Sequence, residues 1–255
     1  MGITPLGETR TRVRRDHAVI ATDSYVESTN THWSETKLVV LVSPAMGSGG
    51  GGDATRGPGF AQYIAITNEQ SSTTCAPDGI QRCLYVIEGE VTLDGEPLTV
   101  GSFAYLPAET TYKLTGKNHG KLLVFEKRYV PLAGVDPPQR IVGHVSNMPA
   151  EPFLGDDDAR LACLLPDEPA FDMAVNVFTY QSGAALPFVE THIMEHGLYM
   201  TAGQGVYRLN ESWYPVAKGD SIWMAAYCPQ WFVAMGKEPA QYVYYKDVNR
   251  FHLPT

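Results

Sequence analysis

Four side chains that commonly bind metal ions lie close together in the second half of the chain. Glu190, His192 and His196 share one short segment, and Gln230 follows in the stretch that begins at Gly219. In an extended strand Glu190 and His192 point to one face, and His196 can return to that face after a short bend. Two imidazoles with carboxylate and amide oxygens, and no thiolate, suit an octahedral Mn(II)-type or Fe(II)-type ion better than structural zinc. The spacing predicts a divalent metal site with two positions open to water or substrate.

Each of these residues taken singly has a simpler interpretation. Either histidine could be a hydrogen-bonded core or surface residue, and Gln230, beside Trp231, could cap a turn. The four residue types together favour the metal site over these alternatives.

A second polar group lies near the end of the sequence. Tyr242, Tyr244 and Lys246 alternate along one run, so in a strand they share a face. A lysine that faces a barrel interior is unfavourable unless it meets an anion. A period of two does not say which face of the strand is inside. From the residues alone, Lys246 could therefore also face outward.

Short strands are the elements that must position these residues. β-Branched and aromatic residues gather in short runs that Gly, Pro or Asp closes, and no long amphipathic helix is evident. This pattern predicts an all-β chain. The expected strands are Lys37–Val42, Gln62–Ile66, Cys83–Ile87, Glu90–Leu93, Phe103–Leu106, Lys121–Phe125, Leu161–Leu165, Val175–Tyr180, Phe188–His192, Gly197–Thr201, Gly205–Leu209, Ser221–Met224, Trp231–Ala234 and Tyr242–Lys246.

An internal repeat divides these strands into two groups. Gly89 and Gly101 bracket a strand in the first half as Gly203 and Gly219 do in the second, and the aperiodic Pro131–Gln139 separates the halves. We therefore expect two jelly-roll β-barrels in one chain. Residues 1–135 would form the first barrel with an N-terminal arm, and residues 136–255 the second, metal-binding and catalytic barrel.

The repeat also predicts what stands at the four ligand positions of the first barrel. These are Ala76, Asp78, Arg82 and Tyr112. No divalent ion fits such a set, so the first barrel is expected to have lost its metal and to serve packing or oligomer formation. Arg82 could hold a substrate anion if the pocket is open.

Composition limits the partners. The formal net charge is -9, and the only Lys/Arg-rich stretch is the short Arg10–Arg15, which argues against a nucleic-acid or anionic-membrane surface. No run of apolar residues is long enough to span a bilayer. We expect a cytoplasmic protein with a small-molecule substrate that forms a homo-oligomer.

The Gly183–Gly203 segment resembles the first part of the cupin signature, G(x)5HxH(x)3-4E(x)6G. The internal spacings are met, but Glu190 stands at the first histidine position, His196 at the glutamate position, and Gln230 at the histidine position of the second part. The leading gap is one residue longer, and Ala225 and Tyr227 replace a proline and a glycine. The resemblance implies a tandem cupin.

Longer stretches resemble the (S)-ureidoglycine aminohydrolase family. They are SPAMGS (43–48), ETHIMEHG (190–197), GQGVYRL (203–209), WYPVAKGD (213–220), CPQWF (228–232) and YKDVNR (245–250). The resemblance implies a manganese-dependent bicupin of purine catabolism that hydrolyses the C–N bond of (S)-ureidoglycine, a small anionic ureide, to (S)-ureidoglycolate and ammonia. It implies Mn(II) held by Glu190, His192, His196 and Gln230, with Tyr207, Tyr242 and Lys246 on the substrate.

Two other functions remain open from the sequence. An Fe(II) dioxygenase of a small acid could use the same ligands, and a non-enzymatic ligand-binding bicupin would need no metal. Glu195, a metal-bound water and a tyrosine are alternative proton donors to ammonia. The order of water addition and imine formation is also open.

Overall fold

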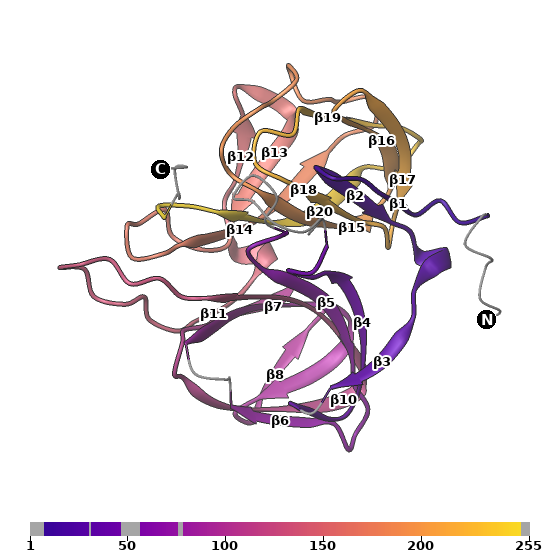
Figure 1. The fold of residues 1–255 in the computed structure, drawn as a ribbon. Helices are drawn as coiled ribbons and strands as arrows, with labels where there is room; N and C mark the ends of the chain where they lie inside the picture. Colours follow the sequence, from indigo (N-terminus) through magenta and orange to yellow (C-terminus); the bar gives the residue numbers. More distant parts are fainter. Residues whose placement is uncertain (1–7, 31, 47–56, 76–78, 251–255) are drawn as a thin grey trace.

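The computed structural model describes residues 8–30, 32–46, 57–75 and 79–250. The strands form two barrels stacked against each other (Figure 1). In these residues helical structure is confined to single turns such as η1 (Thr22–Ser24) and η3 (Val145–Asn147). Within the described ranges no helix is long and apolar enough to cross a membrane. The prediction of an all-β chain with two barrels is confirmed.

The first barrel is built on one sheet of nine strands. A buried aliphatic cluster fills it, with Leu84, Val86, Leu122 and Val124 alternating along its two longest strands. The expected strands Cys83–Ile87 and Glu90–Leu93 are joined in one, β7. The strands are β3 (Glu27–Asn30), β4 (Trp33–Val42), β5 (Ala61–Ile66), β6 (Ser72–Cys75), β7 (Ile80–Leu93), β8 (Glu96–Thr99), β9 (Ser102–Leu106), β10 (Thr111–Arg128) and β11 (Ile141–His144).

The second barrel combines a sheet of eight strands with a sheet of three. The large sheet has the order β1-β2-β18-β15-β20-β14-β13-β12, and the small one β17-β16-β19. The strands are β1 (Arg12–Val13), β2 (His17–Ile20), β12 (Ala150–Phe153), β13 (Asp156–Cys163), β14 (Met173–Tyr180), β15 (His196–Ala202), β16 (Gln204–Leu209), β17 (Ser212–Ala217), β18 (Ser221–Met224), β19 (Gln230–Ala234) and β20 (Ala240–Asp247).

Strand pairing crosses the expected division of the chain at residue 135. The N-terminal arm lies on the second barrel, because β2 pairs with β18 and Arg10 holds the buried carboxylate of Asp220 through two hydrogen bonds of 2.7 and 2.8 Å. Conversely, β11 pairs with β9 of the first barrel. The chain therefore passes to the second barrel after His144, and the exact division into domains stays a prediction.

The two barrels repeat the same backbone conformations. Gly89 and Gly203 have φ of +68° and +67°, and Gly101 and Gly219 have +89° and +95°. Glu109 and Tyr227, each eight residues after the second glycine of its pair, share the left-handed region at +63° and +62°. A non-glycine residue in this region is uncommon, so the agreement shows that the glycine repeat is a structural repeat.

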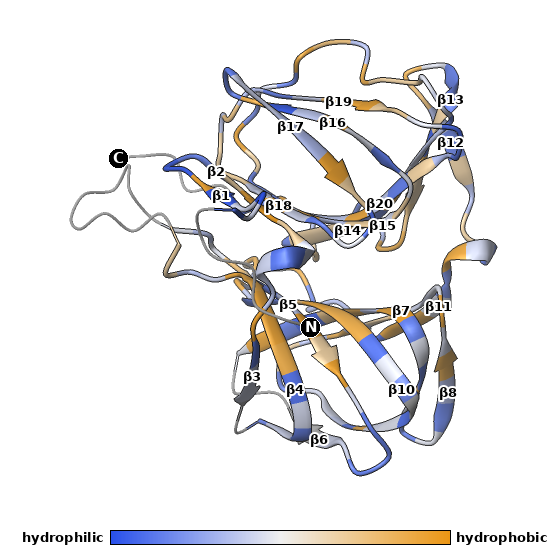
Figure 2. Ribbon diagram, turned by 90° about the vertical axis from the view of Figure 1, so that its right-hand side faces the viewer, coloured by the Kyte–Doolittle hydropathy of each residue, from blue (hydrophilic) through white to orange (hydrophobic). Residues whose placement is uncertain are grey.

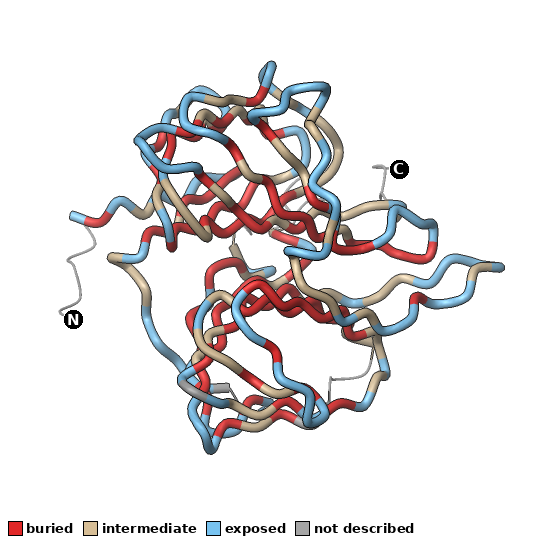
Figure 3. Tube along the Cα trace, turned by 180° about the vertical axis from the view of Figure 1, so that it is seen from behind, coloured by how far each residue is buried: buried red, intermediate tan, exposed pale blue. Residues whose placement is uncertain are grey.

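The barrels meet through their apolar sheets. The hydrophobic half of β4 is directed toward the second barrel in Figure 2, and buried residues line the facing strands of both barrels in Figure 3. Phe60 stacks on Tyr245 with ring centroids 4.1 Å apart. Gln62 donates to the backbone oxygen of Leu198 and to Ser221, whereas the Gln62 side-chain oxygen and the Tyr245 hydroxyl are buried without a hydrogen-bond partner among the described residues.

Candidate metal and substrate site

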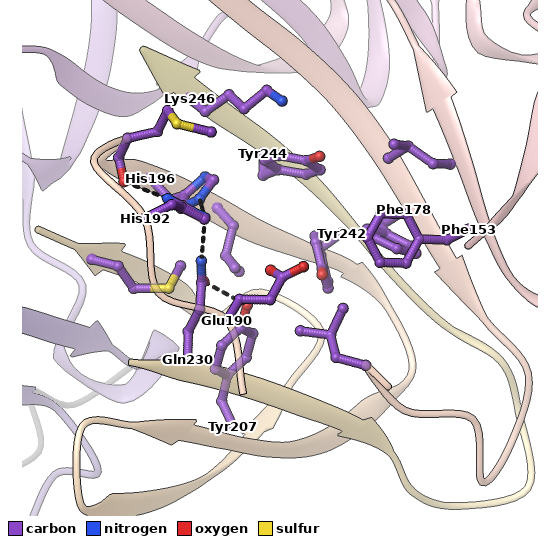
Figure 4. Close-up of a pocket in the computed structure, with 15 residues that line it drawn as sticks. Phe153, Phe178, Glu190, His192, His196, Tyr207, Gln230, Tyr242, Tyr244 and Lys246 are labelled. Atoms are coloured by element: carbon purple, nitrogen blue, oxygen red, sulfur yellow. Dashed lines mark hydrogen bonds between the residues drawn. The ribbon is translucent and has the colours of Figure 1, made fainter. Parts of the chain in front are cut away.

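A cavity of about 180 Å³ opens in the second barrel, and Figure 4 shows the side chains around it. Its other lining residues are mainly aromatic and aliphatic. All seven residues proposed from the sequence line it: Glu190, His192, His196, Tyr207, Gln230, Tyr242 and Lys246. Their placement together is a finding of the structure, whereas their roles as ligands and catalytic groups stay predictions.

The β15–β20 pair settles which face of the last strand is inside. His196 lies opposite Lys246, Leu198 opposite Tyr244, and Met200 opposite Tyr242. Side chains opposite each other on antiparallel strands lie on the same face. Because all of these residues except Met200 line the cavity, the alternating set that includes Lys246 faces inward.

Glu190 and His192 are positioned by a loop and not by a strand. The expected strand Phe188–His192 does not form, and Glu190 makes only an isolated antiparallel bridge with Gln230. The two backbones exchange both hydrogen bonds, at 2.8 and 2.9 Å. This bridge fixes Glu190 beside Gln230, the first residue of β19. The loop then brings His192 to within 3.1 Å of both His196 and Gln230.

The two imidazoles are arranged with their lone pairs facing each other. Nδ1 of His192 lies 3.2 Å from the backbone oxygen of Met194, and Nδ1 of His196 lies 3.3 Å from that of Tyr245. A carbonyl oxygen only accepts, so each Nδ1 carries the proton. In the neutral ring each Nε2 is then an acceptor. The two Nε2 atoms are 3.1 Å apart, with no proton to share.

Burial keeps these rings neutral. The pKa of His196 is lowered to about 3, first by burial and then by His192 and Lys246. The pKa of His192 is also lowered, mainly by burial. Neutral imidazoles with Nδ1 held by a carbonyl are the form that binds a metal through Nε2. Two converging acceptor nitrogens fit a cation between them.

Gln230 and Glu190 are the other two ligands expected from the sequence. The Gln230 amide nitrogen donates to Nε2 of His192, and its oxygen accepts from the Tyr207 hydroxyl at 3.5 Å. As a ligand, Gln230 would present its oxygen instead, since the two ends of an amide have nearly the same shape. Figure 4 shows the Glu190 carboxylate directed toward Tyr242, away from the imidazoles. Burial raises its pKa, an effect that Lys246 partly offsets.

Aromatic rings line one side of the cavity, and Tyr180 and Asn176 contact them from behind. The Tyr180 and Tyr242 hydroxyls are 3.1 Å apart, and Asn176 donates to the Tyr244 hydroxyl at 3.0 Å. Phe178 stacks on Tyr180 with centroids 4.4 Å apart. Asn176, Phe178 and Tyr180 were not expected from the sequence as neighbours of the site. Their inward alternation on β14 within the expected strand Val175–Tyr180 was the signal that could have found them.

Lys246 is a cation available to a ligand. Its side chain is half-buried and lines the cavity. Among the described residues, no carboxylate lies within 4.0 Å of its ammonium nitrogen. A partly desolvated cation without a counter-ion favours an anionic ligand.

Glu195, a proton donor considered from the sequence, and Arg208 of β16 both lie elsewhere. The Glu195 carboxylate accepts from the backbone nitrogen of Gly59 and from the Trp223 indole, so it points toward the first barrel and not into the cavity. This placement removes Glu195 from the candidates for proton donor. Arg208 lies over the ring of Trp213 and donates to the Asn210 carbonyl, away from the cavity lining.

Another cluster of metal-binding residue types serves the N-terminal arm. Asp16, His17 and Cys228 place one ligand atom each within 4.8 Å of the others. However, Nδ1 of His17 bonds to Asp16 at 2.9 Å, and Nε2 bonds to the Tyr214 hydroxyl at 2.8 Å. Burial raises the pKa of Cys228 to about 12, so its thiol stays protonated. These contacts fasten the arm to the barrel, and neither ring nitrogen is left for a metal.

The first barrel has a different pair at the corresponding position. Arg82 lies opposite Glu126 on β7 and β10, as His196 lies opposite Lys246 on β15 and β20. Arg82 donates to Glu126 at 2.5 Å. Tyr112 is buried in the same barrel, whereas the expected positions Ala76 and Asp78 lie outside the described residues.

Comparisons with known proteins agree with this architecture. The cupin domain family matches residues 176–245. The (S)-ureidoglycine aminohydrolase of Arabidopsis thaliana is 39% identical over 96% of this chain and 80% of its own, and that of Escherichia coli K12 is 31% identical over 91% and 88%. The crystal structure of protein Ylba from E. coli has a TM-score of 0.80 at 28% identity, covering 97% of both chains.

Proposed function

The chain belongs to the (S)-ureidoglycine aminohydrolase family, and we propose that its second barrel catalyses the reaction of that name. The substrate would be (S)-ureidoglycine, and the products (S)-ureidoglycolate and ammonia. Water replaces the amine on a carbon that also bears a ureido group and a carboxylate. The cavity must therefore hold an anion, orient one face of that carbon and supply a proton to the leaving amine.

The facing lone pairs of His192 and His196 carry the proposal of a divalent metal. Two neutral nitrogens 3.1 Å apart, both oriented by backbone carbonyls, repel each other unless a cation lies between them. Gln230 and Glu190 would add oxygen donors, and the absence of a thiolate favours Mn(II) over structural zinc. The metal would supply Lewis acidity and fixed positions for substrate atoms. Thiolate binding by Cys228 is disfavoured by its raised pKa.

Lys246 would hold the anionic end of the substrate. It lies directly across the β15–β20 pair from His196, so its charge is beside the metal ligands, and it has no counter-ion among the described residues. A charge contact at this place fixes the substrate relative to the ligands and limits its rotation. The substrate carboxylate is the group that would make this contact with the Lys246 ammonium.

The tyrosines would act as neutral hydroxyl donors. Burial raises the pKa values of Tyr207 and Tyr242 well above the ordinary value, so neither ionises near neutral pH. Each can therefore donate a hydrogen bond to the ureido oxygen or to the departing amine. The ring of Phe178, which lines the cavity, would restrict the water that reaches the reacting carbon.

Ammonia release from freshly prepared ureidoglycine tests the proposal. Protein stripped with a chelator should be inactive, and Mn(II) should restore turnover. The product should be the S enantiomer of ureidoglycolate, which a chiral separation measures. Oxygen uptake in place of ammonia release would contradict a hydrolase. Assembly into a homo-oligomer and a cytoplasmic location stay predictions.

A further inference from the structure

The first barrel contains a larger cavity that the proposed reaction does not use. Its volume is about 400 Å³, against about 180 Å³ for the cavity of the second barrel. It opens where β7 begins and β10 ends, which is the end of the first barrel that corresponds to the site of the second. Ile80, Phe60 and Trp33 supply apolar walls, while Arg82 and Glu126 lie at its polar side.

Arg82 is a buried cation with an unused donor. Its side chain is only 3% exposed, and its Nε donates to Glu126 at 2.5 Å. The Tyr63 hydroxyl donates to the same carboxylate oxygen, and the Trp33 indole donates to Tyr63 at 3.2 Å. Nη1 of Arg82, however, is buried and has no hydrogen-bond partner in the part of the chain that the structure describes. A buried charged donor is unfavourable without an acceptor, and a ligand could provide the acceptor that this atom lacks.

The charges of the cavity favour an anion. Among the described residues, Arg82, Lys127 and Arg128 line it with a single carboxylate, that of Glu126, which Arg82 already neutralises. Lys127 donates to the backbone oxygen of Asp172 at 2.9 Å and pairs with its carboxylate at 3.5 Å, so the lining cation left without such a partner within the described ranges is Arg128, exposed at the rim. The remaining charge of the lining residues is positive. In addition, a guanidinium presents planar donors that match a carboxylate.

We propose that the cavity of the first barrel binds a small carboxylate anion, one oxygen of which reaches Nη1 after a small shift of the Arg82 guanidinium, with the organic part against Trp33 and Ile80. The site needs no metal and is separate from the pocket that contains Lys246. It replaces the lost metal position of the first barrel, because Arg82 stands in the ladder where His196 stands in the second. The ligand class follows from these groups alone and does not depend on the proposed reaction.

Acetate is the simplest probe, and Trp33 is a local reporter. Its indole nitrogen is connected to Glu126 through Tyr63, so occupation of the site should shift its N–H resonance. The signal is assigned by its loss in Trp33→Phe. Titration with acetate at constant ionic strength should give a saturable shift with a dissociation constant on the order of 1–10 mM. Acetamide, which has the same shape without the charge, should give none.

Two variants separate this site from the other cavity. Lys246→Met should leave the acetate shift of Trp33 unchanged. Arg82→Lys keeps a cation beside Glu126 but removes Nη1, so binding should weaken about tenfold or more. If that variant does not fold, the comparison of acetate with acetamide on the Lys246→Met protein decides. No saturable shift in the wild type, an equal response to acetamide, or unchanged affinity in Arg82→Lys would overturn the proposal.

Discussion

Replacement of Lys246 by methionine tests the anion contact of the second barrel. Methionine keeps most of the volume and the packing of the lysine stem while it removes the charge. Lys246 faces the cavity, lies opposite His196 and has no carboxylate within ion-pair distance among the described residues. The change should therefore remove a substrate contact without breaking an internal ion pair.

The expected loss follows from the strength of a charged hydrogen bond. Such a bond contributes about 1.5–3 kcal/mol, so kcat/KM should fall about tenfold to a hundredfold. Burial is the main cause of the lowered pKa of His196, and the lysine charge lowers that pKa further. Removal of the lysine charge should raise the pKa of His196 from about 3 but leave the imidazole neutral at pH 8. Manganese binding should survive.

The assay is steady-state ammonia release at matched manganese content. Lys237→Met is the matched control, because Lys237 is exposed on the same barrel and its removal should leave kcat/KM unchanged. Thermal unfolding of both variants should resemble the wild type. Full efficiency of Lys246→Met at equal metal occupancy would refute the reasoning and assign the substrate anion to another partner.

Three further predictions concern the ligands and the barrel interface. Gln230→His should still bind a divalent ion but shift preference toward Zn(II) or Cu(II) and lower Mn-supported turnover, and metal competition measures this. Replacing both His192 and His196 by Ala should abolish tight metal binding, one ion per chain in the wild type, while urea unfolding stays cooperative. Burial, followed by the charge of Asp247, raises the pKa of Glu195 to about 7, so the folded state holds its proton up to higher pH than the unfolded chain. The stability that this group contributes is therefore lost as pH rises from about 4.5 to 7. In urea unfolding of the metal-free protein, Glu195→Gln should remove this part of the dependence of the free energy of unfolding on pH. An unchanged pH dependence would contradict the prediction.

The sequence predicted side-chain alternation better than it predicted loops. In a strand, alternation is imposed by the backbone, so Tyr242, Tyr244 and Lys246 had to share a face, and only the packing of β20 against β15 decided which one. Glu190 and His192 were correctly expected near His196 but for a reason that the structure does not support. A loop held by one bridge to Gln230 brings them there, and such a contact has no local sequence period.

The N-terminal arm shows a second limit of sequence reasoning. Proximity along the chain assigns residues 12–20 to the first barrel, but β2 completes the sheet of the second barrel beside β18. The tie depends on Arg10 with Asp220 and on His17 with Tyr214, pairs separated by about two hundred residues. None of these four residues lies in a sequence motif that indicates its partner, so pairing between distant segments decides the topology.

A comparison of one ladder position in the two barrels explains why their functions would differ. In the first barrel the cation is Arg82 and its cross-strand partner Glu126 is an anion, so the charges cancel within the protein. In the second barrel the corresponding pair is a neutral imidazole and a free ammonium, His196 and Lys246. Neutral nitrogen can bind a metal, and the unpaired ammonium can bind an anion beside it. Arginine cannot bind a divalent ion, because it has no lone pair to offer and its positive charge repels the ion. The same backbone position thus favours a metal with an anionic substrate in one barrel and excludes a metal in the other.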